Sequence, residues 1–151
     1  MRNDPSYPDA LCQTSFADGI EFQDFVCERL ARDSIILQNF ASKKYQLCRG
    51  ENLQGWEIKL DSRCLDTGRL SIEIAEKSKR DNGNWVDSGI FRGDSWLYIQ
   101  GNYQRLWVFG TKQLQRYFQQ KKPEICESHG TVRKFYIQLP TANAIALRVL
   151  T

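Results

Sequence analysis

The chain has 151 residues, of which 41% are hydrophobic and 12% aromatic, and its formal net charge is +3. This length suggests a single domain, and the composition is that of a globular chain and not of a disordered one. No apolar run approaches the ~20 residues that span a bilayer, and the polar first nine residues do not resemble a secretory signal. We therefore expect a cytoplasmic protein with no membrane segment. The mild positive charge permits nucleic-acid binding without indicating it.

The five cysteines do not form a pattern that indicates a disulfide framework or a zinc site. Their number is odd, no Cys-x-x-Cys pair occurs, and the single histidine, His129, has no partner at ligand spacing. A chain of this size also buries enough surface to fold without disulfides. We expect reduced thiols, mostly in the core.

The N-terminal part predicts an irregular arm over residues 1–15, followed by a single domain over residues 16–151. The domain begins with a helix expected over residues 19–33, because its apolar residues recur at helical spacing. Asp18, with Glu21 three residues later, has the outline of a capping box at the start of this helix. The periodic apolar residues are Phe22, Phe25, Val26 and Leu30.

Two segments in the middle of the chain alternate apolar and polar residues, as strands with one buried face do. They cover residues 55–61 and 70–77, and the linker between them, with Thr67-Gly68, suits an antiparallel hairpin. In such a hairpin the two polar faces coincide. These faces would present Glu57, Lys59 and Asp61 from the first strand, and Ser71, Glu73, Ala75 and Lys77 from the second.

The remaining pattern predicts further strands and helices around this pair. Their order indicates an α+β fold in which a mixed central sheet is flanked by helices, with a tendency toward three α/β layers. The expected elements are a short strand at 35–37, a loop over 79–94, strands at 96–100 and 106–109 joined by a turn at Gly101-Asn102, a helix over 111–119, a linker over 121–129, a strand at 134–139 and a final helix over 142–149; residues 42–47 remain ambiguous.

The charged face of the expected hairpin suggests a metal centre. Carboxylates at close range oppose folding unless a cation screens them, and Mg²⁺ prefers hard oxygen ligands and keeps several waters. A lysine beside such an ion orients water or stabilises the charge of a transition state. The alternative is an ordinary solvent-exposed face, because alternating Glu and Lys is common on antiparallel sheets.

The run Gly-Trp-Glu-Ile-Lys-Leu-Asp at residues 55–61, followed by Leu-Ser-Ile-Glu-Ile-Ala-Glu-Lys at residues 70–77, resembles the core of the restriction-endonuclease-like PD-(D/E)xK nucleases. Segments at 88–92, 95–98 and 106–109 are similar to those of small phage or prophage nuclease-like proteins. The resemblance covers residues 16–150. It implies a restriction-endonuclease-like fold and Mg²⁺-dependent hydrolysis of DNA phosphodiesters by metal-activated water, with Mn²⁺ as a substitute ion. It is also compatible with a homodimer.

The resemblance carries onto the chain in two registers. In the favoured register Asp61 and Glu73 bind the metal, Glu57 is a third ligand or an outer acid, and Lys77 or Lys59 handles the water. This register departs from the family pattern, because the lysine position relative to Glu73 holds an alanine, and a β-bulge would be needed to bring Lys77 into place.

In the second register, Glu57-x-Lys59 is itself the acid-x-lysine doublet, and Glu51 or Asp33 upstream supplies the first acid. Glu21, on the preceding helix, is an auxiliary candidate in either register, although a role as a helix-cap acid explains it equally well.

The loop over residues 79–94 is the candidate nucleic-acid contact. This loop carries the basic residues Lys79, Arg80 and Arg92 together with Trp85. Basic groups with an aromatic ring are suited to a phosphate backbone, although polar loops are ordinary. The alternative function is a catalytically inactive nuclease-fold protein that binds DNA or a protein partner, and Ala75 at the expected lysine position favours it.

Overall fold

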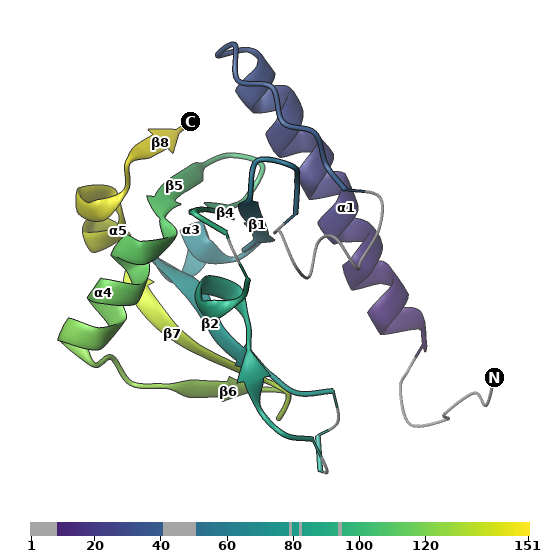
Figure 1. Cartoon of the computed structure of the whole chain (residues 1–151), viewed down its shortest axis with the longest axis vertical. Helices are drawn as coiled ribbons and strands as arrows, with labels where there is room; N and C mark the ends of the chain where they lie inside the picture. Colours follow the sequence, from purple (N-terminus) through teal and green to yellow (C-terminus); the bar gives the residue numbers. More distant parts are fainter. Residues whose placement is uncertain (1–8, 41–50, 79, 82, 94) are drawn as a thin grey trace.

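The computed structural model describes residues 9–40, 51–78, 80–81, 83–93 and 95–151 (Figure 1). Among the described residues no helix has the length and apolar character needed to cross a membrane. The helices are α1 (Asp9–Ala31), α3 (Cys64–Thr67), α4 (Thr111–Lys121) and α5 (Leu139–Ile145), with a 3₁₀ turn η1 (Gly89–Phe91).

The described strands form two four-stranded sheets, so the fold is mixed α+β with two small sheets in place of one central sheet. The first sheet has the order β1-β4-β5-β8 and the second the order β3-β2-β7-β6. Their bounds are β1 (Trp56–Leu60), β2 (Arg69–Glu76), β3 (Val86–Asp87), β4 (Leu97–Gly101), β5 (Leu106–Gly110), β6 (Cys126–Ser128), β7 (Val132–Gln138) and β8 (Arg148–Leu150).

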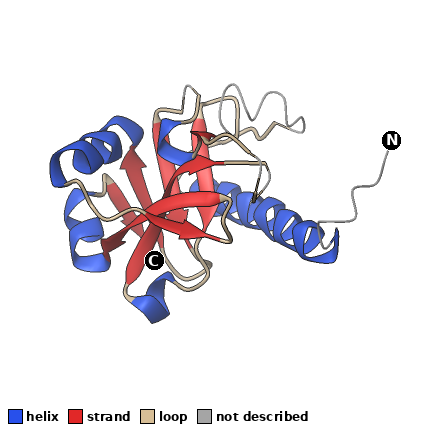
Figure 2. Ribbon diagram, turned by 90° about the horizontal axis from the view of Figure 1, so that it is seen from below, coloured by secondary structure: helices blue, strands red, loops and turns tan. Residues whose placement is uncertain are grey.

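The long helix α1 covers one face of the first sheet (Figure 2). Its buried residues Phe22, Val26 and Leu30 confirm the predicted helical spacing, and they pack against Trp56 and Ile58 of β1. The helix begins at Asp9, however, so residues 9–15 are helical and do not belong to an irregular arm. The predicted capping box at residues 18–21 is therefore wrong, because no proline interrupts residues 9–18 and the helix continues through them.

The opposite face of the first sheet packs against the second sheet, with α4 and α5 beside it. Tyr98, Trp107 and Phe109 come from the first sheet, whereas the second sheet contributes its own apolar residues. Because strand side chains alternate, β4 and β5 each supply both cores. The residues of the second sheet in this core are Leu70, Ile72, Ile74, Phe135 and Ile137.

The predicted hairpin between the two acidic strands is wrong. β1 pairs in parallel with β4, from Trp56 opposite Leu97 onward, and β2 pairs with β3 and β7. The linker between β1 and β2 forms α3, which ends at Gly68 in the left-handed region (φ 69°) and carries the chain from one sheet to the other. Alternation establishes that a segment is a strand, but it does not identify the neighbour of that strand.

The hairpin of β4 and β5 is confirmed, with Leu97 opposite Gly110. Its turn is stabilised by the Asn102 side chain, whose Oδ1 accepts hydrogen bonds from the backbone N–H groups of Gln104 and Arg105 at 2.9 and 3.0 Å. An Asn side chain that caps its own turn is a common device in tight loops.

Several shorter elements differ from the sequence expectation. The final helix covers Leu139–Ile145 and ends before the predicted residue 149. Val149 instead lies in β8, which pairs with β5 and adds a strand to the first sheet. The loop over 79–94 contains β3 and η1, and the linker over 121–129 contains β6. Residues 35–37 are irregular, and residues 42–47 lie outside the described part of the chain.

A β-bulge interrupts β2 at its centre. Glu73 lies opposite Lys134 of β7, but Ala75 lies opposite Arg133, so Ile74 is the extra residue. The segment Ser88-Gly89 covers this bulge, and the Ser88 N–H donates to the Ile74 carbonyl at 3.1 Å. Gly89 has φ 53°, and a Cβ there would lie 2.1 Å from the Glu73 carbonyl oxygen. Only glycine fits this position without displacing β2.

We predict that Gly89→Ala lowers the free energy of unfolding by about 2–4 kcal/mol, because it combines a left-handed backbone with a backbone clash. Urea unfolding followed by circular dichroism measures the change. The matched control is Gly19→Ala in α1, where a Cβ meets nothing within 4 Å. This control should gain about 0.5–1 kcal/mol from helix propensity. Unchanged stability of Gly89→Ala would contradict the proposed close approach.

Candidate functional site

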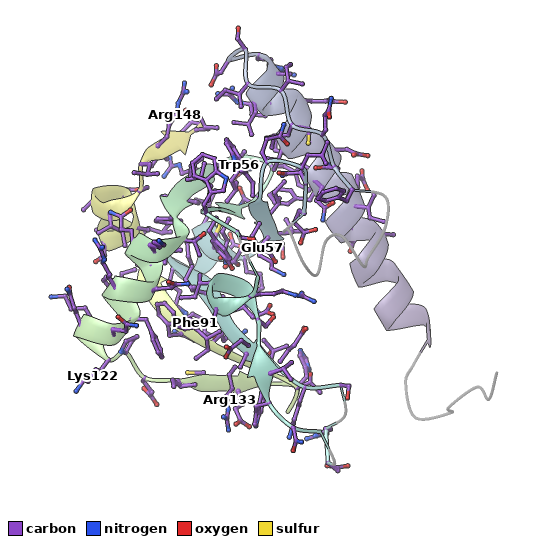
Figure 3. All side chains as sticks on the ribbon, in the orientation of Figure 1. Trp56, Glu57, Phe91, Lys122, Arg133 and Arg148 are labelled. Carbon is purple, nitrogen blue, oxygen red and sulfur yellow. The ribbon has the colours of Figure 1, made fainter. Side chains whose placement is uncertain are left out.

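The centre of the site is an ion pair on the inner face of β1. Glu57 is 1% exposed, and its Oε1 lies 3.0 Å from the Lys59 Nζ. The two side chains share a face because they are two residues apart on a strand. Glu57 lies in the interior of the molecule, whereas Lys122 and Arg133 lie at its periphery (Figure 3). A buried carboxylate destabilises the fold unless it is paired, so the Lys59 ammonium is needed for stability and is also available for chemistry.

Further acidic groups act on Lys59. Burial by itself would lower the pKa of Lys59, but the charges of Glu57, Glu73 and other neighbours raise it above its ordinary value. Lys59 therefore stays an ammonium at neutral pH. Burial raises the pKa of the nearby Tyr98, so this side chain stays a neutral phenol that can donate a hydrogen bond.

Glu51 joins this cluster from the loop before β1. Burial, followed by the charge of Glu57, raises the pKa of Glu51 to about 7, although Lys59 and Arg92 oppose the shift. The Gln23 side chain of α1 donates a hydrogen bond of 2.7 Å to Glu51 Oε2. At neutral pH, therefore, Glu51 is partly protonated.

Glu73 reaches the cluster from the second sheet. The Ser88 hydroxyl, which is fully buried, donates a hydrogen bond to Glu73 Oε1. Because Ser88 and Gly89 also cover the bulge, the same segment fixes both the backbone and the carboxylate of Glu73. The two acidic faces predicted from the sequence thus meet across two sheets and not within a hairpin.

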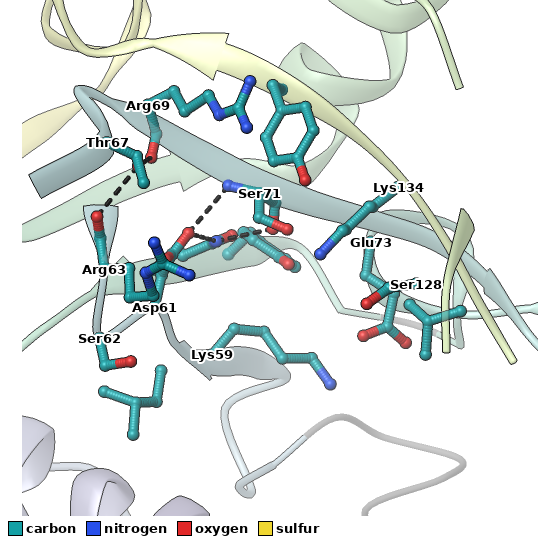
Figure 4. A pocket seen from close by; sticks show the side chains of 15 residues that line it. Lys59, Asp61, Ser62, Arg63, Thr67, Arg69, Ser71, Glu73, Ser128 and Lys134 are labelled. Atoms are coloured by element: carbon teal, nitrogen blue, oxygen red, sulfur yellow. Dashed lines mark hydrogen bonds between the residues drawn. The ribbon is translucent and has the colours of Figure 1, made fainter. Parts of the chain in front are cut away.

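Asp61 has a different environment. Its Oδ2 accepts hydrogen bonds from the Ser71 N–H at 2.9 Å and from the Gln100 Nε2 at 3.0 Å. Gln100 also donates to the Ser71 carbonyl at 2.7 Å. Asp61 therefore links the end of β1 to β2, and its carboxylate is engaged by backbone and amide groups (Figure 4).

A cavity of about 420 Å³ opens beside this cluster. Lys59, Lys134 and Glu73 surround the same space, with Asp61 and Arg63 at its other end (Figure 4). Cations outnumber carboxylates in the lining, so the cavity favours an anionic ligand. The charged lining residues are Lys59, Asp61, Arg63, Arg69, Glu73 and Lys134.

Lys77 lies elsewhere. Its Nζ is 4.9 Å from the centre of the Trp85 ring, which Arg133 also covers at 4.1 Å. Arg133 and Lys134 are consecutive on β7 and point to opposite faces, and Lys134 is the one that lines the cavity. The bulge therefore leaves Lys77 on the side of Arg133, away from Glu73.

The two candidates for the first acid of the second register, Glu51 and Asp33, have different environments. Asp33 forms ion pairs with Arg29 at 3.6 Å and with Arg148 at 2.9 Å, whereas Glu51 interacts with Glu57. Glu21 is exposed on α1, and Gln23 is the residue of that helix that contacts the cluster.

The predicted nucleic-acid contacts are scattered. Arg92 forms an ion pair with Glu76 at 3.6 Å and acts on Glu51, so it belongs to the edge of the cluster. Arg80 is exposed and packs beside Gly130, while Lys79 lies outside the described residues.

Sequence reasoning missed the neutral members of the site, which are Ser88, Tyr98 and Gln100. Tyr98 and Gln100 alternate with Leu97 and Ile99 on a fully buried strand, and a polar residue at a buried position is the signal that could have identified them. Lys134 gave no such signal, because only the cavity of the folded protein brings its side chain near the other charged residues.

Among the described thiols, Cys64 is buried as expected, whereas Cys27 and Cys126 are only partly buried. Cys27, Cys64 and Cys126 are free. Burial, followed by the charge of Asp61, raises the pKa of Cys64 to about 11, and burial raises the pKa of Cys27. A thiol held in its protonated form is a poor nucleophile, so neither Cys27 nor Cys64 is suited to nucleophilic chemistry.

Within the described ranges, no group of three or more His, Cys, Asp or Glu residues has an arrangement that could hold a metal ion. A scan of the chain against protein-family models finds no match, and searches of curated proteins and of solved structures find none either.

We predict that Glu51→Gln changes the pH dependence of stability. The folded protein holds the proton of Glu51 up to a pKa of about 7, whereas the ordinary value is 4.5. The wild type should therefore lose stability as the pH rises from 4.5 through 7, by about 1–3 kcal/mol. Glu51→Gln should lack this loss and be the more stable protein at pH 8.

Urea unfolding at pH 4.5, 6 and 8 checks this expectation, with the exposed Glu124→Gln as the control. Parallel pH profiles for the wild type and Glu51→Gln would show that Glu51 titrates normally.

Proposed function

We propose that the protein is a Mg²⁺-dependent nuclease that hydrolyses DNA phosphodiester bonds, with Mn²⁺ as a substitute ion. The observation that carries the proposal is the buried Glu57–Lys59 ion pair, an acid-x-lysine doublet flanked by Glu51 and Glu73, of which Lys59 and Glu73 line a cationic cavity. The second sequence register is favoured because Glu51 interacts with Glu57, while Asp61 uses its Oδ2 to accept two hydrogen bonds that tie β1 to β2.

The donor set fits a magnesium ion held by few protein ligands. Mg²⁺ is commonly bound by one or two carboxylates together with waters and substrate phosphate, so a three-residue group is not required. Glu57 Oε1 is buried and is engaged by the Lys59 ammonium at 3.0 Å, and Glu51 is the acid beside it. Glu51 and Glu57 would hold the ion, which when bound screens the phosphate charge and activates water.

The other residues of the cluster would orient the reacting groups and stabilise the charge on the phosphate. Lys59 stays charged and contacts both the acids and the cavity, so its ammonium is placed to stabilise negative charge that develops on a phosphate. Glu73, held by Ser88, orients that ammonium from the opposite sheet. Tyr98 stays neutral and offers its hydroxyl to a reacting oxygen.

The second candidate is a nuclease-fold protein that binds DNA or a protein partner without cleaving. Two observations favour it, namely Ala75 at the lysine position of the Glu73 register and the engagement of Lys59 in an ion pair. Salt-dependent DNA binding that is indifferent to Mg²⁺, without cleavage, is the behaviour it predicts.

We predict that the purified protein cleaves DNA in Mg²⁺ and that EDTA abolishes the reaction. Lys59→Met should lower the rate at least ~100-fold, because it removes the stabilising cation. Lys77→Met, a matched substitution on the opposite face, should retain most activity. Gel analysis of labelled single-stranded and duplex oligonucleotides gives the rates.

The exposed Lys112→Met controls for the loss of one positive charge. Cleavage at background level by the wild type would reject the nuclease, and loss of activity in Lys77→Met but not in Lys59→Met would restore the first register.

We also predict that Glu57→Gln weakens Mg²⁺ binding at least ~10-fold while Asp61→Asn does not, because Glu51 and Glu57 would hold the ion whereas Asp61 ties β1 to β2 through the hydrogen bonds of its Oδ2. Isothermal titration calorimetry with MgCl₂, without DNA, measures both affinities. Weaker binding in Asp61→Asn alone would place the ion at the other end of the cavity.

A further inference from the structure

The cavity beside the cluster carries cations that the proposed chemistry does not use. Arg63, Arg69 and Lys134 line it. In the part of the chain that the structure describes, none of the three forms an ion pair, whereas Lys59 is paired with Glu57. Unpaired cations that converge on one cavity create a field that attracts an anion.

Two of these cations are held in place by one aromatic ring. The Arg69 guanidinium lies 3.8 Å from the centre of the Tyr136 ring, and the Lys134 ammonium lies 5.6 Å from it. Stacking orders the guanidinium but leaves its in-plane N–H donors free. These donors form a rigid fork that matches the oxygens of a phosphate.

The inner wall of the cavity offers neutral polar groups. Tyr98 and Gln100 line it and are 0% and 2% exposed, and the Gln100 Oε1 has no hydrogen-bond partner among the described residues. The Gln100 amide is oriented by its donation to Asp61 and Ser71, so Oε1 remains an acceptor. A buried acceptor without a partner is costly, and a ligand with a hydrogen-bond donor would satisfy it.

The size of the cavity limits the ligand. Its volume of about 420 Å³ lies toward the lower end of small-molecule sites, which measure roughly 300–1,000 Å³. A DNA duplex is instead recognised over an extended surface, roughly 1,000–2,500 Å² of protein. A phosphate with one sugar and one base matches both the volume and the arrangement of charged and neutral groups.

We propose that this cavity binds one nucleotide of a single-stranded nucleic-acid chain, with its phosphate at Arg69 and Lys134 and its polar edge at Tyr98 and Gln100. The inference rests on the proposed function and names its substrate class. Because Lys59 and Glu73 belong to both the cavity wall and the cluster, a nucleotide bound here has its phosphodiester beside the reacting groups. Duplex DNA would have to release a nucleotide from its stack before entering.

The test is calorimetric titration with a deoxynucleoside 5′-monophosphate in EDTA at low salt. We expect binding that weakens as salt increases, and a loss of at least ~10-fold in affinity for Lys134→Ala, since hydrogen bonds to charged groups are the stronger kind. Lys134→Arg keeps the charge and should retain the affinity. Arg133→Ala, the neighbouring residue on the opposite face of β7, is the matched control and should bind like the wild type. Urea unfolding verifies that each variant is folded.

Equal affinities of the wild type and Lys134→Ala would overturn the inference. So would inorganic phosphate that binds as tightly as the nucleotide, because the cavity would then recognise phosphate alone. Equal cleavage rates on single-stranded and duplex oligonucleotides would overturn the substrate preference.

The titration also separates this inference from the proposed function. A protein that cleaves DNA in Mg²⁺ but binds no nucleotide in EDTA keeps the nuclease and rejects the cavity. A protein that binds the nucleotide but never cleaves keeps the cavity and rejects the nuclease.

Discussion

The burial of one carboxylate, that of Glu57, constrains the middle of the molecule. Removing a charge from water costs several kcal/mol, and the fold accepts this cost only because Lys59 projects from the same strand face. The constraint then spreads to the neighbours. Glu51, buried and next to Glu57, retains its proton up to near neutral pH, and Gln23 of α1 anchors it. The helix, the strand and the preceding loop are thus tied to one electrostatic centre.

The second sheet meets this centre through an irregularity and not through regular pairing. The bulge at Ile74 allows Ser88-Gly89 to lie against β2, where the serine holds Glu73 and the glycine leaves room for its backbone. A regular strand would have continued the alternation and presented Ala75 next to Glu73. Bulges are frequent beside functional sites because they re-aim side chains, and here the bulge brings Glu76 to Arg92 and separates Lys77 from the cluster.

The local sequence patterns predicted individual helices and strands, whereas the arrangement of the site depends on contacts between residues that are far apart in the chain. The spacing of Phe22, Val26 and Leu30 was sufficient for α1, and alternation was sufficient for β1 and β2. Neither pattern encodes which strands become neighbours, so the hairpin was wrong although its two polar faces do converge. The sequence patterns also could not distinguish between the two acid registers. It depends on the partners of Asp61, which are a backbone N–H and an amide from residues far along the chain.

The parallel pairing of β1 with β4 also bears on the order of folding. Trp56 lies beside Leu97, and the chain between them builds α3, β2, β3 and η1 of the neighbouring layer. Closing so long a loop costs entropy before any contact compensates for it, and non-local pairings of this kind slow folding. The Glu57–Lys59 face therefore acquires its cover only once both sheets are in place. A nascent or partly folded chain presents those charges to water, so the chemical environment of the cluster is a property of the completed fold alone.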